Sequence, residues 1–209
     1  MAQPDQAKTP DGAVRQRLLL AATDLFAKKG YAATTVREIV AAAGVTKPVL
    51  YYYFGSKEGL YLELMETMSS SFLVLLEEPQ PPGATARQRI ERLGELVFHI
   101  YVERIQIMKV MHSIYYGPPQ GAPFVDFDAL HQRFVDEIHR LVREGIAGGE
   151  FQAGDPQVMT WALISAEHLA TELELCSPGV PRMGLEGLRR VISLTLDGIS
   201  TANHRGKVL

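Results

Sequence analysis

The chain contains little cysteine: Cys176 is the only one among its 209 residues. A disulfide within the chain is therefore excluded, and there is no Cys-x-x-Cys pair or Cys/His spacing that would indicate a zinc site. The sequence also lacks a nucleophile elbow, a phosphate-binding loop and a convincing acid–base pair. We therefore expect a protein of the reducing cytoplasm that is not an enzyme and binds no metal and no cofactor.

Long hydrophobic runs and strand-like alternation are missing as well. No apolar run approaches the roughly 20 residues that a membrane-spanning helix needs. The first dozen residues are polar and contain proline, which excludes the apolar segment of a signal peptide. No stretch alternates with period two over a useful length, whereas apolar residues recur at spacings of three and four. These patterns predict an all-α fold without a membrane span.

Excess positive charge is confined to the first part of the chain. Residues 1–60 hold eight Lys or Arg and five Asp or Glu, while residues 61–209 hold thirteen and nineteen, and the whole chain carries a net charge of −3. A modestly basic head on an acidic body suits a protein that docks one face on a polyanion, because the rest of its surface repels that partner.

A capped helix is predicted directly after Thr34. Thr35 is followed three residues later by Glu38, which is the pattern of a capping box at a helix start. Gly44 supplies the left-handed residue at which such a helix commonly ends. The helix is therefore expected to be only about two turns long.

A second short helix follows the glycine turn, from Lys47 to about Phe54. Thr46 stands where it can cap this helix, and Pro48 falls in the first turn, where a missing N–H costs little. Two helices joined by a short turn with glycine form the helix-turn-helix pattern that enters a DNA major groove.

The second helix presents groups that suit DNA. Lys47 can pair with a phosphate or a guanine edge, and the phenols of Tyr51 and Tyr52 can donate to phosphate oxygens. Ser56 is expected to cap a third helix that begins with Lys57, whose ammonium lies at a positive helix end. We interpret this region as a DNA-binding surface.

Residues from about Val14 to Leu64 resemble the DNA-binding domain of the TetR family of bacterial transcriptional regulators. The resemblance is carried by Ala21-Ala22, Leu25-Phe26, Lys29-Gly30-Tyr31, Thr34 to Ile39, Ala43 to Lys47, Leu50 to Phe54 and Ser56-Lys57-Glu58. It implies an N-terminal three-helix helix-turn-helix domain followed by a larger helical ligand-binding and dimerisation domain. We accordingly expect a flexible arm at 1–12, a DNA-binding domain at 13–58 and an effector-binding and dimerisation domain at 59–209.

The resemblance also implies which residues meet DNA. It assigns phosphate contacts to Thr34 or Thr35, Thr46, Lys47, Tyr51, Tyr52 and Lys57, and base contacts to Lys47, Pro48 and Val49. The chain departs from the common family pattern at Pro48 and Val49, where many relatives have glycine or a polar residue, and at Tyr53, where histidine is frequent. We include Tyr53 in the predicted surface, and we expect base reading to use apolar contact with thymine methyl groups.

Helical periodicity continues through the rest of the chain. It predicts helices from Ser56 to about Glu78, from Ile90 to Gly117 with a break near Arg104, from Phe127 to Gly148-Gly149, from Asp155 to Cys176, and from Leu185 to Ala202.

The last two helices carry stripes that suit a four-helix interface between two chains. The predicted interface consists of Val158, Ala162, Ser165 and Leu169 on one helix and of Leu188, Ile192, Thr195 and Ile199 on the other. The family resemblance implies the same homodimer. The alternative is that these stripes pack only within one chain.

The central helices hold the large side chains that an apolar effector pocket would need. The candidates are Phe98, Tyr101, Met108, Met111, His112, Tyr115, Phe134, Trp161 and His168. The alternative for each one is an ordinary core position. By resemblance, such a pocket controls operator affinity.

The sequence therefore predicts a homodimeric, sequence-specific transcriptional regulator, a repressor that a largely apolar small molecule releases from a palindromic operator. One alternative is an activator or a ligand-independent repressor. Another is a helical small-molecule-binding protein that does not use DNA, which the Pro48-Val49 pair suggests.

Overall fold

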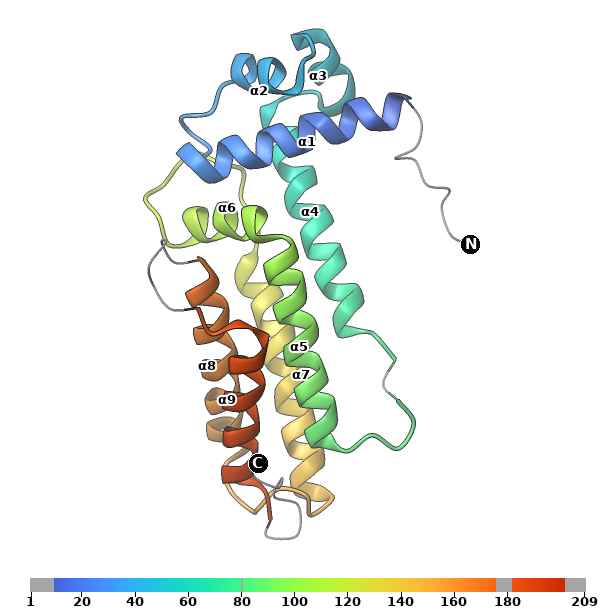
Figure 1. Cartoon of the computed structure of the whole chain (residues 1–209), viewed down its shortest axis with the longest axis vertical. Helices are drawn as coiled ribbons and strands as arrows, with labels where there is room; N and C mark the ends of the chain where they lie inside the picture. The colour runs from blue at the N-terminus through green and yellow to red at the C-terminus, as the bar shows by residue number, and fades with distance from the viewer. Residues whose placement is uncertain (1–9, 80, 176–181, 202–209) are drawn as a thin grey trace. The chain divides into compact units, whose positions relative to one another are not determined.

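The computed structural model describes residues 10–79, 81–175 and 182–201 (Figure 1). Within these residues the fold is all-α, as predicted, and the only strand-like feature is an isolated bridge between Phe151 and Ser200. The helices are α1 (Pro10–Lys29), α2 (Val36–Ala43), α3 (Lys47–Phe54), α4 (Lys57–Leu76), α5 (Ala86–Glu103), α6 (Ile105–Tyr115), α7 (Phe127–Ala147), α8 (Pro156–Leu175) and α9 (Gly184–Ile199).

Helix boundaries agree with the sequence pattern at several ends. The predicted break near Arg104 separates α5 from α6, and α8 begins at Pro156, the position that proline favours at a helix start. Helix α1 begins at Pro10, so the last three residues of the predicted arm are helical. The expected ends at Cys176 and Ala202 lie outside the described residues.

Backbone contacts divide the chain into two compact units. Unit 1 contains residues 1–70 and 106–125, and unit 2 contains residues 71–105 and 126–209. The helix-turn-helix lies in unit 1 together with nearly all of α6, while unit 2 holds α5, α7, α8 and α9. The functional boundary at residues 58 and 59 stays a prediction.

An aromatic cluster lies in the core of unit 1, in the part that holds the helix-turn-helix. Phe26 of α1, Tyr31 of the following turn and Tyr61 of α4 are buried, with ring centroids 5.1 to 6.2 Å apart. Leu18 and Leu50 are also fully buried in this unit. These contacts fix α1 and α4 around the two short helices, which are too short to be stable alone.

The core of unit 2 lies among α5, α7, α8 and α9. Leu93, Ile138, Leu163 and Ile192 each contribute a buried side chain from a different one of these helices. At one end of α5, the Arg87 guanidinium forms an ion pair with Asp197 of α9 at 2.6 Å. The unit is therefore a helical bundle with an apolar interior.

Helix α4 is the one helix among the described residues that is long and apolar enough to cross a membrane. Its 20 residues have a mean hydropathy of 1.2, so by length and composition it could cross a membrane. However, Tyr61, Leu64, Met65 and Met68 are buried in unit 1, and Glu63 and Glu66 interrupt the apolar sequence. A core helix of a water-soluble protein can have the same length and mean hydropathy, so this composition does not indicate a membrane span.

Candidate nucleic-acid interface

The predicted capping box at the start of α2 is confirmed. Thr35 Oγ1 accepts a hydrogen bond from the Glu38 N–H at 3.3 Å, and Glu38 Oε2 accepts one from the Thr35 N–H at 2.9 Å. The Lys29 ammonium donates to Glu38 Oε1 at 2.5 Å. Hydrogen bonds from Lys29 and then Thr35 lower the pKa of Glu38 to about 2. The carboxylate is therefore ionised at neutral pH and ties α1 to the start of α2.

The turn between the two short helices also forms as predicted. Gly44 ends α2 in the left-handed conformation, with φ 65° and ψ 39°, and its N–H donates to the carbonyl of Ala41. Glycine has no Cβ to oppose this conformation. The turn sets the direction in which α3 leaves α2.

Thr46 occupies the cap position of α3, but its hydroxyl makes no capping hydrogen bond. Pro48 has no N–H to offer at the second helical position, and the Val49 N–H donates to the backbone oxygen of Thr46 instead. The side chain of Thr46 is exposed. The proline thus leaves the Thr46 hydroxyl for other uses, such as a phosphate contact.

The outward side of α3 carries the side chains that the sequence assigns to DNA. Lys47 and Pro48 are exposed, as are Tyr51 at 49% and Tyr52 at 78%, while Val49 is half-buried. Their exposure is the condition for DNA contact, and the contacts themselves stay predictions.

The inward side of α3 holds the helix in unit 1. Leu50 and Phe54 are both buried, and the guanidinium of Arg15 lies 5.5 Å from the Phe54 ring centroid. Helix α3 is therefore anchored on one face and open on the other.

Tyr53 is oriented differently from its neighbours. Its hydroxyl donates to the carboxylate of Asp11 on α1, and the hydrogen bond to Asp11 is the main reason that the pKa of Tyr53 rises to about 12. Its ring is half-buried. Tyr53 therefore links α3 to the beginning of α1, and a DNA contact by this phenol would compete with Asp11.

Two predicted phosphate contacts, Thr34 and Lys57, are engaged within unit 1. Thr34 is buried and its hydroxyl donates to the Gly30 carbonyl at 2.8 Å, so Thr35 is the accessible member of this pair. The Lys57 ammonium donates to the carbonyls of Tyr31 and Thr34 at 3.1 and 3.0 Å and lies 4.0 Å from the Tyr31 ring centroid. These contacts use two of the three ammonium N–H groups. The role of Lys57 at DNA stays a prediction.

Gln120 joins the loop after α6 to the turn after α1, and nothing in the sequence pattern indicated it. Its Oε1 accepts a hydrogen bond from the Tyr31 N–H at 2.7 Å, while its Nε2 donates to Ser113 Oγ at 2.8 Å. Gly30 permits this approach, because a Cβ there would lie 2.5 Å from Gln120 Oε1. Gln120 therefore ties α6 to the helix-turn-helix within unit 1.

The predicted effector residues do not form one set. Phe98 and Phe134 are buried in unit 2, and Tyr101 is half-buried, whereas Trp161 is 59% exposed and His168 is exposed. The four other candidates, Met108, Met111, His112 and Tyr115, belong to α6 in unit 1. Trp161 and His168 lie on the outer face of α8, so an interior ligand within unit 2 would not meet them without rearrangement.

The two halves of the predicted dimer interface also differ. On α8, Val158 is 54% exposed and Leu169 50% exposed, and Ala162 and Ser165 are exposed too, so this half forms an outward face. Trp161 extends the same face, because helix positions three and four apart are neighbours.

The α9 half of that prediction requires correction. Leu188 and Ile192 are buried in the core of unit 2, and Ile199 packs against the same core. Thr195 is half-buried and donates to the Val191 carbonyl. Leu194, which is 72% exposed, is the large apolar side chain that α9 presents outward. The apolar spacing identified the face of α9 that packs within the chain.

Glu167 was missed by the sequence reasoning. It is buried on the inner face of α8, between the buried residues Leu163 and Ala170, and its Oε1 has no hydrogen-bond partner. The available signal was position, since the apolar period of α8 passes through residue 167. Among the residues that the structure describes, no group of three or more His, Cys, Asp or Glu could hold a metal ion.

Comparisons with known proteins agree with this arrangement. A family model described as bacterial regulatory proteins of the tetR family matches residues 18–64. RutR of Escherichia coli K12, an HTH-type transcriptional regulator, is 31% identical over 172 residues, which cover 76% of this chain and 74% of RutR. QacR of Staphylococcus aureus, another HTH-type transcriptional regulator, is 28% identical over 156 residues, 68% of this chain and 76% of QacR.

A solved structure extends the likeness to the fold. The crystal structure of PfmR, a TetR family transcriptional regulator of Thermus thermophilus, is 25% identical, with a TM-score of 0.68, and covers 88% of this chain and 100% of that one. The family-model match falls on α1 to α4, where the capping box, glycine turn and exposed α3 lie. The chain belongs to the TetR family and is a DNA-binding transcriptional regulator.

Proposed function

We propose that the chain is a cytoplasmic homodimeric repressor that a small-molecule effector releases from a palindromic operator. The observation that carries this proposal is the open face of α3, where Lys47, Pro48, Tyr51 and Tyr52 are exposed. The capping box defines where α2 begins, and Pro48 lies in the first turn of α3. A short helix of this kind, held on its inner side by Leu50 and Phe54, suits a major groove.

The roles on this face follow from the chemistry of its side chains. Lys47, Pro48 and Val49 at the start of α3 read bases, with the two apolar residues suited to thymine methyl groups. Thr46, Tyr51 and Tyr52 are hydroxyl donors for phosphate oxygens, which position the helix without reading sequence. The Thr35 hydroxyl donates to Glu38 Oε2 at 2.7 Å and would have to leave that carboxylate to donate to a phosphate.

The outer face of α8 supports a second copy of this chain as the partner. Val158, Trp161, Ala162 and Leu169 place exposed apolar or small side chains along the helix, with the polar Ser165 between them. A twofold axis brings the same patch from two chains together, so one self-complementary stripe is enough. Two recognition helices related by that axis require an inverted repeat in the DNA.

Selection of bound duplexes from a random DNA pool tests the proposal. The purified full-length protein should enrich an inverted repeat whose half-sites lie about one helical turn apart or a multiple of it. Enrichment of a single, unrepeated site would contradict the dimer, and no enrichment at low salt with folded protein would contradict DNA recognition. A reporter driven by the selected operator, compared with and without the regulator gene, gives the sign of regulation.

A further inference from the structure

Glu167 lies inside the helical bundle of unit 2 in a setting that ordinary packing does not explain. Its side chain is buried and its Oε1 accepts no hydrogen bond. Glu174, two helical turns further along α8, is equally buried, but its carboxylate accepts the Gly184 N–H at 3.3 Å and pairs with Arg182 at 3.6 Å. Of the two buried carboxyls of α8, one therefore has hydrogen-bond and ion-pair partners and the other has an oxygen without a partner.

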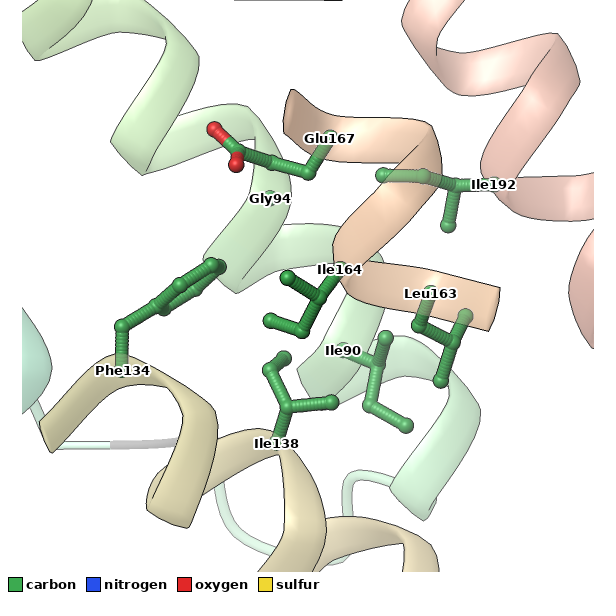
Figure 2. A pocket seen from close by; sticks show the side chains of 8 residues that line it. All are labelled: Ile90, Gly94, Phe134, Ile138, Leu163, Ile164, Glu167 and Ile192. Atoms are coloured by element: carbon green, nitrogen blue, oxygen red, sulfur yellow. The ribbon is translucent and has the colours of Figure 1, made fainter. Parts of the chain in front are cut away.

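A small cavity lies beside Glu167, shown in Figure 2. Its volume is about 10 Å³, roughly the space that one water molecule requires. Its walls come from four helices and include Ile90 and Gly94 of α5, Phe134 and Ile138 of α7, Ile164 of α8 and Ile192 of α9. All residues that line it with Glu167 are apolar or glycine, so Glu167 is its one ionisable side chain.

Gly94 of α5 lines the same cavity. In Figure 2 the Glu167 side chain extends toward the side of the cavity on which Phe134 lies. A Cβ at position 94 would approach Ile192 Cδ1 to 2.7 Å, so even alanine there would force that side chain to move. The cavity thus depends on a missing side chain on one helix and on a buried acid on another.

Burial raises the pKa of Glu167 to about 8, so the carboxyl keeps its proton in most molecules at neutral pH. A buried polar group without a partner is costly, and a ligand that donates to it recovers that cost. A cationic donor gains most, because charge-assisted hydrogen bonds are roughly twice as strong as neutral ones. An anionic ligand would leave water for a cavity whose other walls are apolar, and it would find no opposite charge there.

We propose that Glu167 and this cavity form the effector site, and that the effector is an organic amine with an apolar body. The inference rests on the proposed function in that the ligand is the molecule that alters operator binding. The ammonium donates to the Glu167 carboxylate, whose O–H bond breaks on binding and whose proton passes to water. The apolar body lies among Ile90, Phe134 and Ile138, which must move apart because the present cavity holds only about one water.

Three probes of equal length separate head-group chemistry from apolar contact: n-hexylamine, n-hexanol and hexanoate. Titration calorimetry with the full-length protein at pH 7 should show binding of hexylamine, weaker binding of hexanol and none of hexanoate. Measured in buffers of different ionisation enthalpy, hexylamine binding should release about one proton. Equal affinity for hexylamine and hexanol, or no binding of hexylamine, would overturn the proposal.

Two variants test whether Glu167 is the recognition group. Glu167→Gln keeps the shape and removes the ionisable proton, so hexylamine affinity should fall roughly tenfold or more while hexanol affinity is kept. Glu174→Gln is the matched control on the same helix and should bind hexylamine like wild type. Wild-type hexylamine affinity in Glu167→Gln would overturn the assignment.

The two proposals fail in different ways. Duplex selection without amine tests the DNA-binding function alone, whereas calorimetry without DNA tests the amine site alone. When both succeed, hexylamine should displace the wild-type protein from its selected duplex and should leave the Glu167→Gln complex intact. An amine that binds the protein at Glu167 without displacing the duplex would contradict the effector role.

Discussion

Helices α3 and α8 differ in how far they separate polar from apolar side chains. Helix α3 buries Leu50 and Phe54 and exposes Lys47, as expected of a surface helix. Helix α8 exposes Trp161 and Leu169 while it buries Thr160, Thr171 and two glutamates. This mixed pattern is why we propose two recognition faces on α8, one for a partner chain and one for a ligand inside the bundle.

The largest expected effect comes from the outer face of α8. Ala162→Arg places a charge on the proposed twofold patch in both chains, and like charges that face each other cost several kcal/mol. The dissociation constant of the dimer should rise by roughly two orders of magnitude or more, as measured by analytical ultracentrifugation. Val102→Glu, at a 42% exposed position of α5, is the control and should leave the dimer intact. A wild-type dimer in Ala162→Arg would remove α8 from the interface.

The inner face of α8 gives the next effect. Glu167→Leu removes an unpartnered buried carboxyl and should raise the free energy of unfolding by about 1–3 kcal/mol at pH 7. Because burial raises the pKa of Glu167 to about 8, wild-type stability should be full below the ordinary value of 4.5 and fall as pH rises through 8. Urea unfolding between pH 5 and pH 9 checks both. If the free energy of unfolding changed with pH in the same way for wild type and Glu167→Leu, the pKa of Glu167 would not be raised in the folded protein.

Lys47 and Lys57 sharpen the description of the DNA-binding face. Lys47 is exposed at the start of α3, so Lys47→Ala should weaken operator binding by about 1–3 kcal/mol and reduce the salt slope by about one. Lys57 donates to two backbone carbonyls, so Lys57→Ala should chiefly lower the melting temperature. Fluorescence anisotropy across a salt series, with thermal unfolding alongside, separates the two. A salt slope reduced by one in Lys57→Ala would place its ammonium at a phosphate.

The smallest effect concerns the cap of α2. Glu38 has its pKa lowered to about 2 by Lys29 and Thr35, so its contribution to stability is present above pH 4.5 and is lost as pH falls toward 2. Glu38→Gln should therefore melt slightly lower than wild type at pH 7, and the difference should shrink as pH falls from 4.5 toward 2. Calorimetric melting curves test this, and a difference that does not change with pH would mean that ionisation of Glu38 contributes nothing.

Local sequence signals predicted the helix-turn-helix because its determinants lie close together in the chain. Thr35 meets Glu38 one turn away, and Gly44 acts on its own backbone, so neither depends on distant packing. The exposure of Tyr51 and Tyr52 followed from the same short helix. The contacts of Tyr53 and Lys57 were harder to predict, because their partners are distant in the sequence. Tyr53 donates to Asp11, and Lys57 donates to backbone carbonyls of the turn after α1.

The helical body was predictable in its elements but not in its faces. Apolar spacing located α8 and α9, yet it could not tell which stripe of α9 packs within the chain, so Leu188 and Ile192 were placed at the surface although they are buried. Spacing within α8 could have placed Glu167 on the buried face of the helix, but it could not show that Oε1 lacks a partner. Whether a carboxyl has a partner depends on what the other helices bring to it, and no spacing rule within α8 reports that.

We propose that two copies of this chain, paired through α8, place two α3 helices on one operator. The most direct test is the number of chains bound to one selected duplex, measured by native mass spectrometry for the intact inverted repeat and for a duplex with one half-site scrambled. We predict two chains, or a multiple of two, on the intact repeat, and a large loss of affinity on the scrambled one. A single chain that binds both duplexes equally well would contradict it.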